Sequence, residues 1–378
     1  MKNKMLCLLL MLFAVINGSY AQQSDTQAPG TTASEAKLSF SEMPDLKEAF
    51  IDASPGYRKD GIIVGELGVD GGNKARILQL AQEIARNKHL GYDALLISQK
   101  GKLLFESYYS RGRIDLPHPQ ASATKAYTCM ALGRAIQMGY LSMADLDKPL
   151  IGFLKELDTT KLVEGAEKIT LHQALTMRSG IRISEERRKE LEKNKNQLKG
   201  QAQVQVYLEY SEPITAASQR FSYKDDPRLV MQVIQAVIPG TAEDFIKKEL
   251  LDKMGITNYG WGTDEVNGLP QSGSRTTMTS RDMVKWGTLA MNKGQWNGEQ
   301  LVPEAFISKA TSRILLTGDD DVYGGGKDVF NQGYGYYWWS ADLKYGNKSY
   351  FSRSAQGGGG QYIPDRRAGS NDSGYRSQ

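Results

Sequence analysis

Hydrophobic and polar positions follow two different periods in the first third of the chain. Residues 74–88 place apolar side chains every three or four positions, which is the spacing of one helix face. Residues 92–98 and 102–109 are instead strand-like, and the Gln-Lys-Gly sequence at 99–101 is typical of a short hairpin turn. This region therefore predicts a helix followed by a β-hairpin.

Helical periodicity dominates the middle of the chain, and strand patterns return near its end. A helix is predicted from about Ser122 to Gly139, where glycine is a typical C-terminal stop. Further helical or loop-helix segments are predicted at 145–157, 170–177, 204–210, 227–237, 242–253 and 281–292. Late strands are predicted at 334–340, 349–352 and 361–363. This order predicts an α+β fold, with a sheet built from both chain ends and a helical insertion between them.

The two ends of the chain differ from this globular pattern, which spans residues 40–363. Residues 1–21 resemble a secretory signal, with basic residues, an apolar run and a Ser-Tyr-Ala cleavage site. Because the run is short for a membrane span, we expect a periplasmic or secreted protein with no stable membrane insertion after cleavage. Residues 22–39 predict a flexible leader, and the polar residues 364–378 predict a disordered tail.

Composition and charge narrow the classes of function. The 378 residues are 40% hydrophobic and 24% charged, which argues against a wholly disordered chain. The net charge of +4 is mild and no basic stripe is interleaved with aromatic residues, so no nucleic-acid partner is expected. Three scattered histidines form no zinc pattern, so no metal or cofactor is expected either. Cys129 has apolar neighbours that indicate a core residue and not a nucleophile.

The candidate chemistry lies in Ser122-Ala123-Thr124-Lys125, at the start of the predicted helix. A serine and a lysine three residues apart lie one turn apart on the same helix face. An amine in that position can accept the hydroxyl proton and activate the serine as a nucleophile. The N-terminus of the helix also offers free N–H groups where an oxyanion can form. The pattern is the S-x-x-K arrangement of serine acyl-transfer enzymes.

Seven segments, taken in order, carry a resemblance to a known family. They are ASATK at 121–125, LHQALTMRSGI at 171–181, RFSY at 220–223, GTAEDFIKKELLDKMGI at 240–256, MTSRDMVKWGTLAMNKGQWNGEQLVP at 278–303, GYGYYWW at 333–339 and GGGGQYI at 357–363. From about residue 91 to residue 363 the chain thus resembles the class C β-lactamase-related serine hydrolases. That family includes class C β-lactamases, D-alanyl-D-alanine carboxypeptidases, esterases and 6-aminohexanoate-dimer hydrolases.

The resemblance implies a serine β-lactamase and penicillin-binding-protein-like fold, with an antiparallel sheet flanked by helices and a helical insertion subdomain. It implies that Ser122 is the acylated nucleophile, Lys125 its base and Tyr223 the proton shuttle. Asp225 stands where the family often has Asn, although a helix N-cap role fits it equally well. The third family motif is best matched by Gly358-Gly359-Gly360, so that Gln361 would face Ser122 and complete the oxyanion hole with its N–H.

Two departures from the family pattern affect the expected activity. The third motif usually begins with Lys or His, but this chain has Gly358, so a cation for a substrate carboxylate is missing. The missing cation makes penicillins less favoured as substrates and favours a small ester, amide or peptide-like substrate. After Ile363 the polar tail replaces the expected strand and terminal helix, which therefore are predicted to be missing. The alternative is a catalytically weak penicillin-binding or peptidoglycan-binding protein, compromised by C-terminal truncation.

The aromatic run at 334–339 is a further candidate feature. Alternating bulky residues are typical of strand packing, which is the simpler interpretation. A second hypothesis is that one or two of these rings line the substrate cleft.

Overall fold

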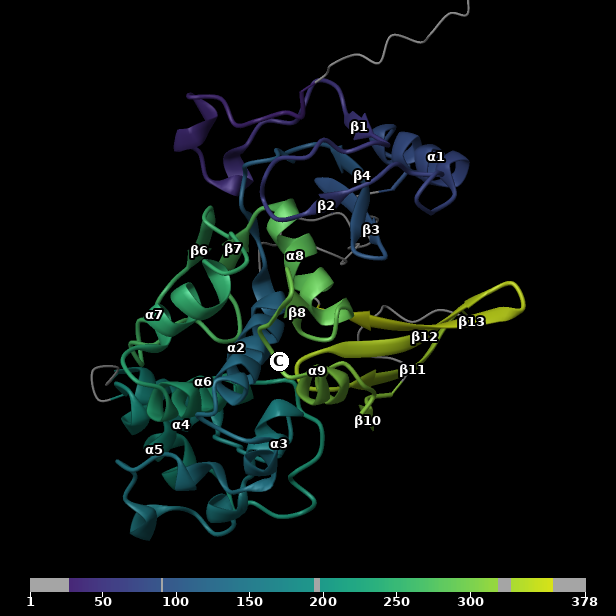
Figure 1. Ribbon diagram of the computed structural model, residues 1–378. Coiled ribbons are helices and arrows are strands. Elements are labelled where there is room, and N and C mark those ends of the chain that lie inside the picture. Colours follow the sequence, from purple (N-terminus) through teal and green to yellow (C-terminus); the bar gives the residue numbers. More distant parts are fainter. Residues whose placement is uncertain (1–26, 90, 194–197, 319–327, 356–378) are drawn as a thin grey trace, which may run out of the picture.

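The fold consists of an N-terminal sheet, a helical central region and a C-terminal sheet. A computed structural model describes residues 27–89, 91–193, 198–318 and 328–355. In Figure 1 the N-terminal sheet and its helix lie at the top, most helices occupy the middle and bottom, and the C-terminal sheet extends to the right. Strands, helices and strands thus follow one another in the order that the sequence predicts.

Strand β4 (Lys102–Tyr108) is the centre of the N-terminal sheet. It pairs antiparallel with β1 (Phe50–Asp52) and β3 (Ala94–Gln99), and parallel with β2 (Ile63–Val64). The predicted hairpin turn joins β3 to β4, and Gly101 adopts a φ of 76° there. Tight hairpin turns need this left-handed conformation, which glycine adopts without a steric penalty. The predicted hairpin is therefore confirmed.

Helix α1 (Lys74–Ala85) corresponds to the first helical pattern of the sequence. Its buried residues Ala81 and Ile84 belong to one apolar cluster with Leu104 and Phe105 of the central strand. An amphipathic helix of this kind is held mainly by the burial of its apolar face. This cluster fixes the outer helix on the N-terminal sheet.

Helix α2 (Thr124–Gln137) is the buried centre of the helical region. All its residues except the last are buried, as expected for a helix that is packed on every side. Helices α6 (Asp226–Val237) and α9 (Glu304–Ala310) pack against it. Gly139 follows its end with a φ of 82°, which confirms the predicted glycine stop.

Shorter helices surround α2. Further α-helices in the described chain are α3 (Leu171–Leu175), α4 (Glu185–Lys193), α5 (Gln201–Glu209), α7 (Ala242–Ile246) and α8 (Ser280–Met291). Helix α7 continues directly into the π-helical turn η9 (Lys247–Leu251). Single 3-10 turns occur at η1 (Glu35–Lys37), η2 (Phe40–Glu42), η3 (Ala121–Ala123), η4 (Met143–Asp147), η5 (Leu150–Gly152), η6 (Thr159–Lys161) and η7 (Ala166–Lys168). The helical pattern at 145–157 becomes two such turns because Pro149, which has no N–H to donate, lies between them.

The C-terminal sheet is antiparallel, in the order β10 (Leu315–Leu316), β11 (Val329–Tyr334), β12 (Trp339–Tyr345), β13 (Lys348–Ser354). The prediction of a single strand over 334–340 is wrong. The chain turns back between β11 and β12, where Tyr337 has a φ of 62°. The N–H of Gly335 donates to the Trp338 carbonyl at 2.8 Å and closes this turn.

The two larger sheets are separate within the described parts of the chain, so the prediction of one sheet from both chain ends is not met there. Strand β4 pairs with strands of the N-terminal part, and β13 pairs with β12. The strand predicted at 361–363 lies outside the described residues. Small additional pairings join β5 (His118–Pro119) to β7 (Thr276–Met278), β7 to β6 (Tyr259–Trp261), and β8 (Gln295–Trp296) to β9 (Glu299–Gln300).

The described part of the predicted leader, residues 27–39, is mostly exposed but contacts the rest of the fold at several points. Glu35 pairs with Arg113 at 2.8 Å, and the Arg113 side chain is only 4% exposed. The N–H of Ile114 donates to the Pro29 carbonyl at 2.9 Å, and Thr31 donates to the Asp115 carboxylate. A buried guanidinium requires a partner of opposite charge. These contacts connect three points of the predicted flexible leader to the rest of the fold.

Candidate active site

Ser122 lies in the 3-10 turn η3, immediately before helix α2. The preceding residue, Ala121, has a φ of 40°, a left-handed conformation that a residue with a Cβ adopts only at a cost. Two contacts to strand β7 hold this turn in place. The N–H of Gln120 donates to the Thr276 carbonyl at 2.8 Å, and the Thr124 and Thr276 hydroxyls are 2.9 Å apart. The serine is thus presented on a strained and anchored turn.

Lys125 is in direct contact with the serine. Its Nζ donates to Ser122 Oγ at 3.0 Å and to the carbonyl of Gly273 at 2.9 Å. The residue is only 7% exposed, and burial lowers its pKa to about 8, against an opposing effect of the Asp225 charge. Because the charged amine is poorly solvated here, a useful fraction is neutral near physiological pH. A neutral Lys125 can accept the proton of Ser122.

Tyr223 completes the cluster from a segment about 100 positions further along the chain. Lys125 Nζ lies 4.6 Å from the centroid of its ring, a cation–π contact. The ring also lies 5.3 Å from Trp339 and 6.1 Å from Tyr334, both in the C-terminal sheet. Those two residues are buried, which confirms the strand-packing interpretation, and Tyr223 is 37% exposed. The structure therefore brings together Ser122, Lys125 and Tyr223.

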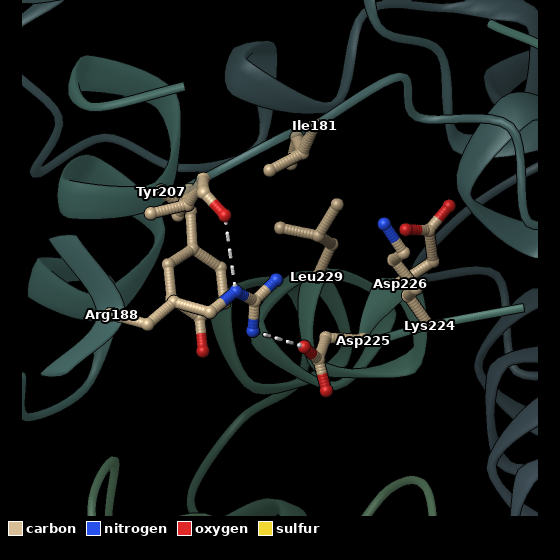
Figure 2. Close-up of a pocket in the computed structure, with 8 residues that line it drawn as sticks. Ile181, Arg188, Tyr207, Lys224, Asp225, Asp226 and Leu229 are labelled. Atoms are coloured by element: carbon tan, nitrogen blue, oxygen red, sulfur yellow. Dashed lines mark hydrogen bonds and ion pairs between the residues drawn. The ribbon is translucent and has the colours of Figure 1, made fainter. Parts of the chain in front are cut away.

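Asp225 does not join this group through a direct contact. It is the N-cap residue of α6, but its side chain makes no capping hydrogen bond. Instead its carboxylate accepts from Arg188 Nη1 at 3.1 Å, and Figure 2 shows the guanidinium of Arg188 directed toward it. Its influence on Lys125 is electrostatic, since its negative charge favours the protonated amine.

The neighbouring residue Asp226 was not singled out from the sequence. It is buried, and its two carboxylate oxygens accept from Ser179, from the N–H at 3.0 Å and from the hydroxyl at 2.8 Å. Burial raises the pKa of Asp226 to about 7, against the effect of these hydrogen bonds. The N–H of Ser222 also donates to the Met177 carbonyl at 2.9 Å. Residues on both sides of Tyr223 are therefore fastened to the loop 177–179.

The predicted oxyanion strand cannot be placed. Gly358, Gly359, Gly360 and Gln361 lie outside the described residues, so their roles stay predictions. Strand β13 is described as far as Ser354, which pairs with Trp339 beside the Tyr223 ring.

Other chemistry is not favoured by the described residues. Among them, no group of three or more His, Cys, Asp or Glu residues could hold a metal ion. Cys129 is fully buried, and burial raises the pKa of its thiol, which keeps it protonated. None of the described helices is both long and apolar enough to span a bilayer.

An α+β fold with a serine and a buried lysine at the start of its central helix is the arrangement of the serine β-lactamase and penicillin-binding-protein class. The model of the beta-lactamase family matches residues 78–369, and the chain belongs to that family. The predicted family and the α+β fold class are thus confirmed, whereas the predicted loss of the C-terminal strand and helix concerns residues outside the described part of the chain. The curated proteins that were searched include no match to the sequence.

Solved structures agree on the fold. A penicillin-binding protein homologue from Caulobacter crescentus has a TM-score of 0.53 at 14% identity, covering 71% of this chain and 80% of its own. The hydrolase EstCE1, described as having promiscuous acyltransferase activity, has a TM-score of 0.51 at 14% identity. The match covers 71% of this chain and 82% of EstCE1. An octameric penicillin-binding protein homologue from Pyrococcus abyssi has a TM-score of 0.50 at 17% identity. The match covers 71% of this chain and 65% of the homologue. At these identities the likeness concerns the fold alone.

Proposed function

We propose that the protein is an exported serine hydrolase that forms an acyl-enzyme on Ser122 and hydrolyses an ester or amide bond. The observation that carries this proposal is the 3.0 Å contact between Ser122 Oγ and the buried amine of Lys125. Membership of the beta-lactamase family supports it. The signal-like residues 1–21 support a periplasmic or secreted location.

Acylation begins with proton transfer from Ser122 to the neutral amine of Lys125. The Gly273 carbonyl accepts one N–H of that amine, which leaves the nitrogen lone pair free to turn toward Ser122 Oγ. Oγ then attacks the substrate carbonyl, and the negative charge moves to the carbonyl oxygen. The N–H of Ser122 is available to stabilise that oxyanion, and the N–H of Gln361 is the predicted second donor.

Collapse of the tetrahedral intermediate breaks the bond to the leaving group. The leaving alcohol or amine takes up the proton held by Lys125, with Tyr223 as the proposed relay, because the Tyr223 ring lies against the amine. Water then attacks the acyl-enzyme, gives one proton to the same base, and releases the acid. Ser122 regains its proton at the end of the cycle.

The substrate is proposed to be a small ester or amide. Gly358 supplies no cation at the third motif, which disfavours penicillins. The hydrolase EstCE1, which shares the fold and is described as having promiscuous acyltransferase activity, is consistent with this proposal. A peptide-like amide remains within the same proposal.

The test is turnover of a nitrophenyl ester and of a chromogenic cephalosporin by the wild type and by Ser122→Ala. We expect ester turnover that is lost in Ser122→Ala and kept in Ser34→Ala, a control on the exposed N-terminal segment. Equal rates in the wild type and Ser122→Ala would overturn the nucleophile assignment. A burst of acylation without turnover would favour the alternative, a penicillin-binding or peptidoglycan-binding protein.

A further inference from the structure

The chain segment that carries Tyr223 separates two different environments. On one side, Phe221 and Tyr223 pack against Tyr334 and Trp339, with ring centroids between 5.2 and 6.1 Å apart. Other residues of the same segment line a groove: Ala217, Ser218, Arg220, Ser222, Lys224 and Asp226.

The groove is large enough for a small molecule. Its volume is about 430 Å³, which is within the size range of ligand pockets. The rest of its lining consists of Met177, residues 179–182, Glu212 and Thr215. Ser122 and Lys125 do not belong to its lining, so the groove is a site separate from the nucleophile.

Two cations on the groove wall are available to a ligand. Among the described residues, neither Arg220 nor Lys224 forms an ion pair or side-chain hydrogen bond. Other cations nearby are neutralised: Arg182 pairs with Glu212 at 2.8 Å, and Arg188 pairs with Asp225. The Ser222 hydroxyl lies between the two available cations in the sequence and lines the same wall.

Two carboxyl groups face the groove and must be considered. Glu212 is compensated by Arg182. Asp226 is buried at the base, where Ser179 donates to both of its oxygens. Burial raises the pKa of Asp226 to about 7, and the Asp225 charge acts in the same direction, whereas the Ser179 hydrogen bonds and the Lys224 charge oppose it. This carboxyl is therefore uncharged in part of the molecules at neutral pH. The groove therefore keeps a positive balance of charge.

We propose that this groove binds an oxyanion, a carboxylate or a phosphate, through Arg220 and Lys224 with the Ser222 hydroxyl as a third donor. The anion belongs either to a free small molecule or to the far end of the substrate. Because Ser222 and Lys224 are the direct neighbours of Tyr223, occupancy of the groove is coupled to the position of Tyr223.

The first experimental arm measures binding of citrate and of inorganic phosphate by calorimetry at pH 6.5. We expect Arg220→Gln and Lys224→Gln each to weaken binding about fivefold, the factor for one partly exposed charge contact. Lys248→Gln, an exposed lysine on the distant turn η9, is the matched control and should bind as the wild type does. Ser122→Ala should bind normally, which separates this proposal from the proposed hydrolysis.

The second arm compares the KM of a neutral ester with that of the same ester carrying a terminal carboxylate. If free anions do not bind but Arg220→Gln and Lys224→Gln raise the KM of the charged ester alone, the substrate is the source of the anion. Circular dichroism establishes that each variant is folded. The proposal is overturned if Arg220→Gln and Lys224→Gln change neither the affinity for free anions nor the KM of the charged ester. It is also overturned if Lys248→Gln has the same effect as these two variants.

Discussion

The activity of this protein should rise with pH as Lys125 loses its proton. The Ser122 hydroxyl can pass its proton only to a neutral amine, and burial lowers the Lys125 pKa to about 8. With that pKa, about one tenth of the molecules carry a neutral Lys125 at pH 7 and about nine tenths at pH 9. The kcat/KM for an ester should therefore increase about tenfold between these two pH values.

The assay follows a nitrophenyl ester at constant ionic strength, with the rate of Ser122→Ala subtracted at every pH as the background. Lys125→Arg provides the matched variant. It keeps a positive charge that can contact Gly273, but a guanidinium stays protonated across this range. Its activity should be absent at both pH values.

A flat profile in the wild type would refute the role of Lys125 as the base. So would a midpoint near the ordinary lysine value of 10.5, because the structure attributes the lowered pKa to burial of the amine. Substantial activity in Lys125→Arg would point to another proton acceptor.

Three further predictions test the surroundings of the pair. Tyr223→Phe keeps the ring against Trp339 but removes the hydroxyl. Its kcat should therefore fall by about two orders of magnitude, with little change of KM. An unchanged kcat in steady-state kinetics would exclude Tyr223 as the proton relay. For Asp226, the pKa in the folded state, about 7, lies above the ordinary 3.8, so its contribution to stability is greatest below pH 4 and is lost as the pH rises to 7. Asp226→Asn should remove this loss, so between pH 4 and pH 8 its free energy of unfolding should rise by up to about 4 kcal/mol relative to that of the wild type, as measured by urea unfolding. Parallel pH dependences of the two proteins would contradict the buried environment of Asp226. Glu35→Ala leaves the buried Arg113 without its carboxylate and should lower the free energy of unfolding by about 2 kcal/mol, seen as a lower Tm, whereas Glu48→Ala should have little effect.

The local parts of the site could be predicted from the sequence because their geometry is set by the helix itself. Ser122 and Lys125 are three residues apart, and this spacing brings their side chains together whatever the rest of the fold does. The glycine stop after α2 is predictable for the same reason, since it depends on the conformation of one residue.

The long-range parts could not be predicted in this way. The acceptor for Lys125 is the Gly273 backbone carbonyl, which every residue type possesses and no sequence pattern marks. Two adjacent aspartates, Asp225 and Asp226, stand at the start of α6. Asp226 is the one that is buried, where it accepts a hydrogen bond from Ser179, 47 residues earlier in the chain. Similarly, Arg113 buries its charge against Glu35, which lies in a stretch whose composition is that of a flexible leader.

The contact between Lys125 and Gly273 also has a consequence for folding. It closes a loop of 148 residues, and Tyr223 is held by rings of the C-terminal sheet more than 100 residues further along the chain. Contacts at such sequence separation form late, because the entropy of closing the loops is lost before the contacts exist. During refolding, helix content should therefore return before esterase activity. The serine should therefore stay unreactive until the last third of the chain has folded.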